Sequence, residues 1–223
     1  MNSKFKIDST WKNYKLSVTK KYGFVDLSIS PLVIKAKDIL LKHKCKRILD
    51  LGCGNGKHSI YLNSSGFDVY ASDIDCSKII KNTEKLNLSN LIIRKHSFTA
   101  IPYDNDFFDA VICTSTLHHA VISDINQGIN EVYRALKSNG YFVFDFLSAL
   151  DTSYGLGTKI EKNTFIGSRT GEENIPHHYT DESELKALLN KFSFANINKS
   201  IYSFYDSKNN QYSSRVFDVI AIK

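Results

Sequence analysis

The sequence predicts an α/β protein with a doubly wound, mostly parallel sheet and helices on both faces. Strand-like apolar runs alternate with helical patterns between residues 47 and 147, and two further strand-like runs close the chain. Continuous apolar strands that alternate with helices are typical of a parallel sheet whose two faces are both covered. A chain of 223 residues is long enough for one such domain with a sizeable core.

The predicted elements of the first part follow one another in order. Strands are expected at 47–51, 67–73, 90–95, 108–115 and 141–147, and helices at 56–66, 76–88 and 123–140. Gly66 and Gly140 mark helix ends, and Ser123 is the expected N-cap of the third helix. Right-handed crossovers place the carboxyl ends of these strands on one edge of the sheet, where ligands bind.

The pattern changes after residue 147. Residues 148–180 are rich in Gly, Ser, Thr and Asn, which predicts an irregular insertion, with or without short helices, over the ligand-binding edge. A helix is expected at 180–192 with Thr180 as its N-cap. Residues 194–206 and 213–223 are expected to form an antiparallel hairpin.

We expect one domain over residues 1–223 with four parts. These are an N-terminal lid at 1–30, a cofactor-binding half at 31–147, a substrate-covering insertion at 148–180, and a C-terminal helix and hairpin at 181–223.

The composition excludes several classes of protein. No apolar run approaches the roughly 20 residues that span a bilayer, so no membrane association is expected. The first fifteen residues contain no apolar stretch typical of a secretory signal, which predicts a cytoplasmic location. The spacing of Cys45, Cys53, Cys76 and Cys113 matches no zinc pattern, so no metal ligands are expected.

The net charge of +6 is concentrated at the N-terminus. Residues 1–22 contain six lysines and a single acid, Asp8. Such a basic segment is compatible either with contacts to nucleic acid or with a solvated N-terminus.

A glycine-rich turn, "DLGCGNG", follows the first predicted strand. Gly52, Gly54 and Gly56 let the backbone turn sharply and let a ligand approach closely. The N-terminus of the next helix adds free N–H groups and a partial positive charge. The spacing is G-x-G-x-G and differs from the G-x-G-x-x-G of dinucleotide-binding proteins.

This turn resembles the first motif of the class I S-adenosylmethionine-dependent methyltransferases, (D/E)-x-G-x-G-x-G, with Asp50 as the leading acid. "VYASDID" resembles their second motif, in which an acid after strand 2, here Asp73, holds the ribose hydroxyls. "HSFTAIPYDNDFFDAVICTSTLHH" and "EVYRALKSNGYFVF" resemble the two regions that follow. The sequence departs from the family at Ser97, where an aspartate usually accepts a hydrogen bond from the adenine amino group.

The resemblance implies the fold, the cofactor and its contacts. The fold would be a seven-stranded sheet of order 3-2-1-4-5-7-6 with the last hairpin antiparallel. The cofactor would be S-adenosyl-L-methionine, with S-adenosyl-L-homocysteine as the product. The implied cofactor-binding residues are Asp50, Gly52, Gly54, Gly56, Asp73, Ile74, Ser97, Phe98, Thr114 and, on the N-terminal lid, Tyr14.

The acceptor of the methyl group stays open at this point. Similarity to methyltransferases of the tellurite- and thiopurine-resistance type implies a small molecule, attacked by in-line displacement, with residues 148–180 over it. Similarity to tRNA wobble-uridine methyltransferases implies RNA as the alternative partner. A third interpretation is a cofactor-binding partner subunit without activity.

Candidate catalytic residues are His118, His178 and Tyr179. A histidine can accept a proton near neutral pH, so these side chains are suited to orient or deprotonate the acceptor. The histidine pair after the fourth strand is also compatible with a purely structural role. The protein is expected to be a monomer or a homodimer.

Overall fold

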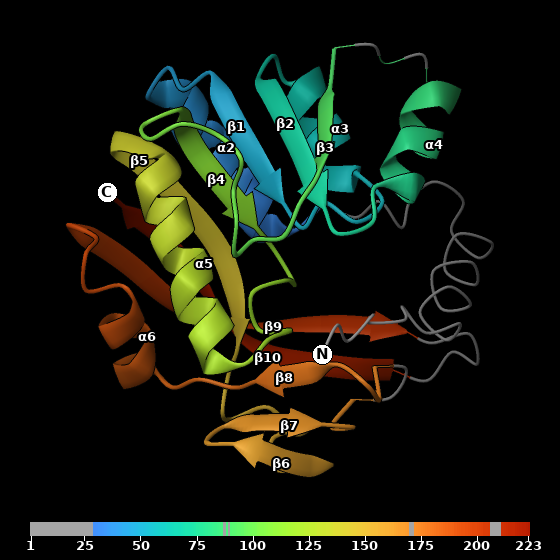
Figure 1. The fold of residues 1–223 in the computed structure, drawn as a ribbon, viewed down its shortest axis with the longest axis vertical. Coiled ribbons are helices and arrows are strands. Elements are labelled where there is room, and N and C mark those ends of the chain that lie inside the picture. The colour runs from blue at the N-terminus through green and yellow to red at the C-terminus, as the bar shows by residue number, and fades with distance from the viewer. Residues whose placement is uncertain (1–28, 87, 89, 170–171, 206–210) are drawn as a thin grey trace.

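The computed structural model describes residues 29–86, 88, 90–169, 172–205 and 211–223. Its main feature is a seven-stranded sheet with the order β3-β2-β1-β4-β5-β10-β9 (Figure 1). The first five strands pair in parallel, and β10 pairs antiparallel with both β5 and β9. This arrangement confirms the predicted strand order, with β10 and β9 as the last two strands.

Up to the end of β5, the elements follow the order that the hydrophobic pattern predicts, with α2 as an addition. In the first part they are α2 (Pro31–Lys42), β1 (Arg47–Leu51), α3 (Lys57–Ser64), β2 (Asp68–Asp73), α4 (Ser77–Lys85), β3 (Ile92–Lys95), β4 (Phe108–Cys113), α5 (Ile122–Ala135) and β5 (Leu136–Leu147). In the second part they are β6 (Thr158–Glu161), β7 (Thr164–Ile166), β8 (Pro176–His178), α6 (Glu182–Leu188), β9 (Phe194–Tyr205) and β10 (Gln211–Ile222).

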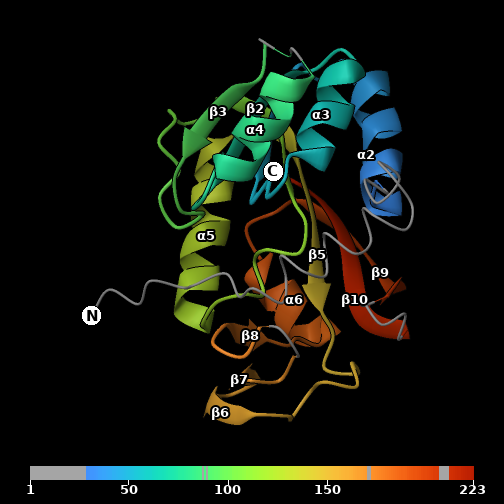
Figure 2. The ribbon, with the colours of Figure 1, turned by 90° about the vertical axis from the view of Figure 1, so that its right-hand side faces the viewer.

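Both faces of the central strands β1, β4 and β5 are buried, and successive side chains of each strand point to opposite faces. In β5, Phe142, Phe144 and Phe146 belong to the apolar cluster that includes α5 and α6. Tyr141 and Val143 belong to the cluster that includes α2 and α3. Figure 2 shows α5 on one side of the sheet and α2 with α3 on the other.

Helix α2 is not among the predicted elements. Pro31 occupies its first turn, where the missing N–H costs nothing. Leu32, Val33, Ala36 and Leu40 form a buried stripe with helical spacing. The helix therefore depends on burial against the sheet.

The predicted start of α5 at Ser123 is wrong. The N-cap is Val121, which has no side-chain cap, and the Ile122 N–H donates to the Glu161 carboxylate at 2.6 Å. A carboxylate from β6 therefore takes the place of a local N-cap. The predicted end at residue 140 is also wrong, because β5 begins directly at Leu136.

The predicted N-cap of α6, Thr180, is likewise replaced by its neighbour. The Asp181 carboxylate accepts a hydrogen bond from the Glu184 N–H at 2.8 Å. The C-terminal hairpin is confirmed, and part of its connecting segment, 206–210, lies outside the described residues.

The prediction of an irregular insertion at 148–180 is corrected by the structure. Strands β6, β7 and β8 form a separate antiparallel sheet, here called the cap sheet, which lies beyond the carboxyl end of β5 (Figure 1). Asn163, in the left-handed region at φ 61°, makes the turn between β6 and β7. Strands of three or four residues are too short to show a period in the sequence.

The proposed N-terminal lid, including Tyr14, lies almost wholly outside the described residues. Among the described helices, none has the length and apolar character required to cross a membrane.

Candidate cofactor and acceptor site

The glycine-rich turn adopts a backbone that other residues rarely take. Gly52, Gly54 and Gly56 have φ angles of 78°, 55° and 83°. A Cβ at Gly52 would lie 2.2 Å from the Thr116 hydroxyl oxygen, and one at Gly56 would lie 2.5 Å from the Ile79 side chain. Conformation and close packing therefore both require glycine at Gly52 and Gly56.

Asp73 connects the end of β2 to this turn. One of its carboxylate oxygens accepts from the Gly54 N–H at 2.8 Å, and the other accepts from the Asp75 N–H at 3.1 Å. Each carboxylate oxygen has a second lone pair available for an external hydroxyl donor. This geometry suits a ligand with neighbouring hydroxyl groups.

Asp50 lies beneath the turn and is buried. Its carboxylate accepts from the Ser59 hydroxyl at 2.5 Å. Burial raises the pKa of Asp50 to about 6, against the opposing effect of the Ser59 hydrogen bond. The residue therefore holds the turn against α3 from inside.

The ends of β2 and β3 provide an apolar and a polar group side by side. Ile74 is 50% exposed, as a residue that covers a flat ring would be. The Ser97 hydroxyl lies 2.8 Å from the Thr99 hydroxyl, and the Phe98 ring occupies the space that a Cβ at Gly128 would need. Ser97 therefore already has an internal partner.

Thr114 follows β4 and contacts a buried histidine. The Ser30 N–H donates to His58 Nε2 at 3.2 Å, so the other ring nitrogen, Nδ1, carries the proton and donates to the Thr114 hydroxyl at 3.1 Å. Burial lowers the pKa of His58 to about 3, which keeps the ring neutral. The start of α2 is thereby linked to the cofactor side of β4.

Of the three candidate catalytic residues, His118 keeps a ring nitrogen without a protein partner. Its ring is buried, and Nδ1 has no hydrogen-bond partner among the described residues. Burial lowers the pKa of His118 well below its usual range, so the ring is neutral. Its carbonyl accepts from the His178 N–H at 2.8 Å, which attaches the cap sheet to the segment after β4.

The other two candidates are fully engaged inside the cap. The His178 ring lies 2.7 Å from the Thr164 hydroxyl and 3.3 Å from the Glu184 carboxylate. The Tyr179 hydroxyl bonds the hydroxyls of Ser153 and Ser168. Both side chains are buried, and their polar atoms contact other parts of the protein.

Asp145 on β5 completes the polar groups at this edge. Its carboxylate accepts from the Ser115 N–H at 2.7 Å. Burial raises the pKa of Asp145 to about 7, and the nearby Asp218 acts in the same direction.

The structure also gathers three residues that the sequence analysis did not connect. His119, Glu172 and His177 offer ligand atoms that lie within 4.8 Å of one another. His119 follows β4, whereas Glu172 and His177 lie more than fifty residues further along the chain, so no local pattern in the sequence joins the three. The absence of a regular metal-ligand spacing explains why no such cluster was expected.

The described residues fit a nucleoside cofactor. A Cβ at Gly52 or Gly56 would collide with a neighbouring side chain, so the turn can only be built with glycine at these positions. The Asp73 carboxylate can accept further hydrogen bonds, and the next residue, Ile74, offers an exposed apolar surface. Gly52 lies on the side of Thr116, toward the acceptor edge, and Ile74 follows β2. One end of a bound nucleoside cofactor would therefore lie near the end of β4, and the other near the end of β2.

Residues 49–144 match the model of the family described as "Methyltransferase domain". The chain is 26% identical over 168 residues to the putative methyltransferase YqeM of Bacillus subtilis, covering 74% of this chain and 66% of that protein. It is 34% identical over 111 residues to a glycine/sarcosine N-methyltransferase of Aphanothece halophytica, covering 48% of this chain and 42% of that protein. The chain therefore spans two thirds or less of these relatives.

A solved structure with a similar fold is TehB from Haemophilus influenzae. The TM-score is 0.66 at 21% identity, over 92% of this chain and 65% of that one. The 1,6-didemethyltoxoflavin-N1-methyltransferase of Burkholderia thailandensis, solved with its acceptor and S-adenosylhomocysteine, gives a TM-score of 0.60 at 15% identity, over 100% of this chain and 93% of that one. Residues 49–144 therefore match a methyltransferase domain, and the fold is consistent with that of the class I S-adenosylmethionine-dependent methyltransferases.

Proposed function

We propose that this chain transfers a methyl group from S-adenosyl-L-methionine to a small-molecule acceptor by in-line displacement. The observation that carries the proposal is the cap sheet, which is built onto the carboxyl ends of the parallel strands. Thr180 and Leu147 join it to β5 through a hydrogen bond of 2.8 Å, and His178 joins it to the segment after β4. An acceptor enclosed under such a cap is small.

The residues around the glycine-rich turn would hold the cofactor. Asp73 would accept from the ribose hydroxyls, and Ile74 would lie against the adenine. Ser97 and Phe98 would lie at the edge of the base, with the Phe98 N–H as a donor. Asp50 would support the turn from below.

The methionine end would lie between the turn and the end of β4. Gly52 and Gly54 allow the backbone to approach it, and Thr114 would contribute its backbone. S-adenosyl-L-methionine supplies a methyl group already activated by its positively charged sulfur. The protein then has to align the acceptor with the methyl carbon and to exclude water.

Of the three candidate catalytic residues, we assign His118 to the acceptor. Its unpartnered Nδ1 would hydrogen-bond and orient the acceptor, whereas His178 and Tyr179 would keep the cap sheet in place. His118→Gln should therefore lower kcat with little change in cofactor affinity. His178→Gln should mainly lower the melting temperature, and equal loss of kcat in both folded variants would contradict this division of roles.

The proposal is consistent with the small acceptor bound in the toxoflavin enzyme. An RNA acceptor receives less support, because Lys44 and Lys46 precede β1 and Arg47 is its first residue, so all three lie at the opposite end of the strands. The lysines of residues 1–22 remain the only candidate RNA contacts from the sequence.

Methyl transfer into fractionated cell extract tests the proposal. Purified chain and S-adenosylmethionine labelled in the methyl group are incubated with a low-mass filtrate, total RNA or protein, with Asp73→Ala as the matched control. Label in the filtrate that disappears with the control supports the proposal. Nuclease-sensitive label in RNA overturns the acceptor class, and tight S-adenosylhomocysteine binding without any label indicates an inactive partner subunit.

A further inference from the structure

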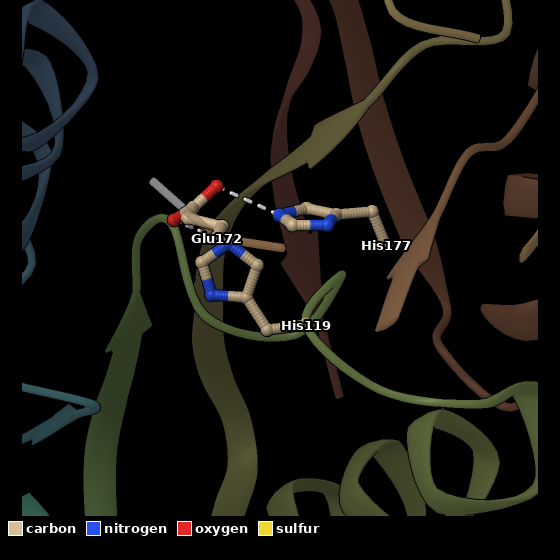
Figure 3. Close-up of side chains that lie close together, drawn as sticks. All are labelled: His119, Glu172 and His177. Carbon is tan, nitrogen blue, oxygen red and sulfur yellow. Dashed lines mark hydrogen bonds and ion pairs between the residues drawn. The ribbon is translucent and has the colours of Figure 1, made fainter. Parts of the chain in front are cut away.

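A compact cluster of potential metal ligands lies at the acceptor edge (Figure 3). His119 follows β4, Glu172 lies between β7 and β8, and His177 is on β8. One Glu172 oxygen lies 2.8 Å from His177 Nε2, and the other lies 3.6 Å from His119 Nε2. Three segments that are remote in the sequence thus bring two imidazoles and one carboxylate together.

The donor set and its spacing suit a zinc-like ion. Zinc binds imidazole nitrogen and carboxylate oxygen at about 2.0–2.2 Å, which places tetrahedral ligand atoms roughly 3.4 Å apart. Each Glu172 oxygen faces a different imidazole, and one ligand atom from each of the three residues lies within 4.8 Å of the other two, so small side-chain adjustments would give this spacing. Two histidines and one glutamate leave the fourth tetrahedral position open, as in catalytic zinc sites.

The cluster is buried and is supported from behind. Glu172 is 5% exposed and His177 is 0% exposed. The Arg169 guanidinium lies 3.5 Å from the Glu172 carboxylate and is itself held by the Ser214 hydroxyl at 2.6 Å. Such outer contacts orient the ligands of a metal site.

The polar arrangement is incomplete within the described protein. His177 Nδ1 and His118 Nδ1 are buried and have no hydrogen-bond partner among the described residues, and their rings lie 6.5 Å apart. These nitrogens are not the ones that face Glu172, so they indicate a further polar species beside the cluster, such as a water molecule that would orient the rings from behind. The competing explanation is a hydrogen-bonded brace in which Arg169 and the two imidazoles hold Glu172 without a metal ion.

The cluster lies next to the glycine-rich turn. The His119 N–H donates to the Thr116 carbonyl at 3.0 Å, and the Thr116 side chain fills the space beside Gly52. Thr116 therefore contacts both the His119 backbone and the part of the turn assigned to the methionine end of the cofactor.

We infer that His119, Glu172 and His177 bind one divalent transition-metal ion of the zinc class. Building on the proposed function, the open position would hold a thiol or hydroxyl group of the acceptor. Coordination would promote loss of its proton to solvent. The freed electron pair would form the new bond to the methyl carbon, while the old carbon–sulfur bond would break with its electrons left on the cofactor sulfur.

Calorimetric titration of the chelator-treated full chain with zinc chloride tests this inference. Wild type should bind one equivalent with micromolar or tighter affinity. His119→Gln and His177→Gln should each weaken binding at least 100-fold, while His43→Gln, at the opposite end of the sheet, should bind like wild type. Cobalt(II) substitution should give the visible absorption of a tetrahedral site in wild type and His43→Gln only.

Circular dichroism identifies any variant that fails to fold. Because His119 is partly exposed and His177 is fully buried, His119→Gln should disturb folding less than His177→Gln. Absence of zinc binding by wild type, or binding by His119→Gln equal to that of His43→Gln, would overturn the metal site and leave the brace. S-adenosylhomocysteine titration of the same proteins separates the two proposals. If wild type bound zinc but not S-adenosylhomocysteine, the proposed function would be refuted and the metal site would stand. If it bound S-adenosylhomocysteine but not zinc, the metal site would be refuted and the proposed function would stand.

Discussion

Gly52 and Gly155 share an unusual backbone but differ in their surroundings. Their φ angles are 78° and 82°. A Cβ would meet Thr116 at Gly52, whereas nothing lies within 4 Å at Gly155. Comparing substitutions at the two glycines therefore distinguishes the free-energy cost of the left-handed backbone from the effect of a steric clash with Thr116 beside the proposed cofactor site.

Gly52→Ala should weaken S-adenosylhomocysteine binding at least tenfold, because Thr116 or the turn must shift to admit the methyl group. Gly155→Ala should cost stability of about 1 kcal/mol and leave cofactor affinity unchanged. Isothermal titration and thermal unfolding of both variants measure these effects. Equal loss of cofactor affinity in the two proteins would refute the assignment of the turn to the cofactor.

Asp145 gives the stability of the protein a defined pH dependence. Its folded-state pKa of about 7 lies above the value of about 3.9 in an unfolded chain. The folded state therefore holds the proton more tightly, so this contribution is present below pH 4 and is lost as the pH rises to about 7.

In Asp145→Asn this loss should disappear. The free energy of unfolding of wild type, relative to the variant, should fall by up to about 4 kcal/mol between pH 4 and pH 8. Urea denaturation across this range measures the difference, from which contributions common to both proteins, such as that of His58, cancel. A constant difference would show that Asp145 does not change its pKa on folding.

Residues that act through local backbone geometry were predictable from the sequence. The motif spacing identified Gly52 and Asp73, which the structure joins through the turn. The meeting of His119 with Glu172 and His177 was not predictable, because it depends on how the cap sheet settles on the end of β4. The internal partners of His178 and Tyr179 likewise follow from tertiary packing alone.

At the level of the elements, the N-terminal caps of two helices differ from those expected from the local sequence. Helix α6 begins with a side-chain cap one residue later than expected, at Asp181. Helix α5 begins with a carboxylate from β6. The cap strands escaped prediction because such short strands show no period. Helix α2 was missed although its buried residues have helical spacing and Pro31 stands in its first turn.

Asp181→Ala should destabilise the protein by about 1 kcal/mol, since the Glu184 N–H loses its acceptor. Ser183→Ala is the matched control, because Ser183 is exposed and lies within the same helix. Chemical denaturation with unchanged slope would show that the effect is on stability alone. A loss no larger than that of the control would exclude Asp181 as the effective cap.

For the whole molecule, strand order followed from the sequence because parallel strands, right-handed crossovers and a final hairpin leave few arrangements. The two apolar clusters then divide the side chains of each strand between the faces. The order of the strands determines which loops meet at the ligand-binding edge. The proposed N-terminal lid would complete this edge from outside the sheet.

Deletion of residues 1–22 tests that lid. The truncated chain should keep its cooperative unfolding, because the described core lies after residue 28. It should bind S-adenosylhomocysteine at least tenfold more weakly if the lid with Tyr14 covers the cofactor. Unchanged affinity in the truncated protein would remove the lid and Tyr14 from the cofactor site.

The hydrogen bond between the Ile122 N–H and Glu161 also gives the protein an internal reporter of cap movement. This amide is at the start of helix α5, which packs on the seven-stranded sheet, whereas its acceptor is on β6 of the cap sheet. Lifting the cap sheet would therefore release one amide at the start of α5 to exchange with deuterium, while the rest of the helix stays protected. The exchange rate at residue 122, measured with and without ligand, would show how often the acceptor side opens.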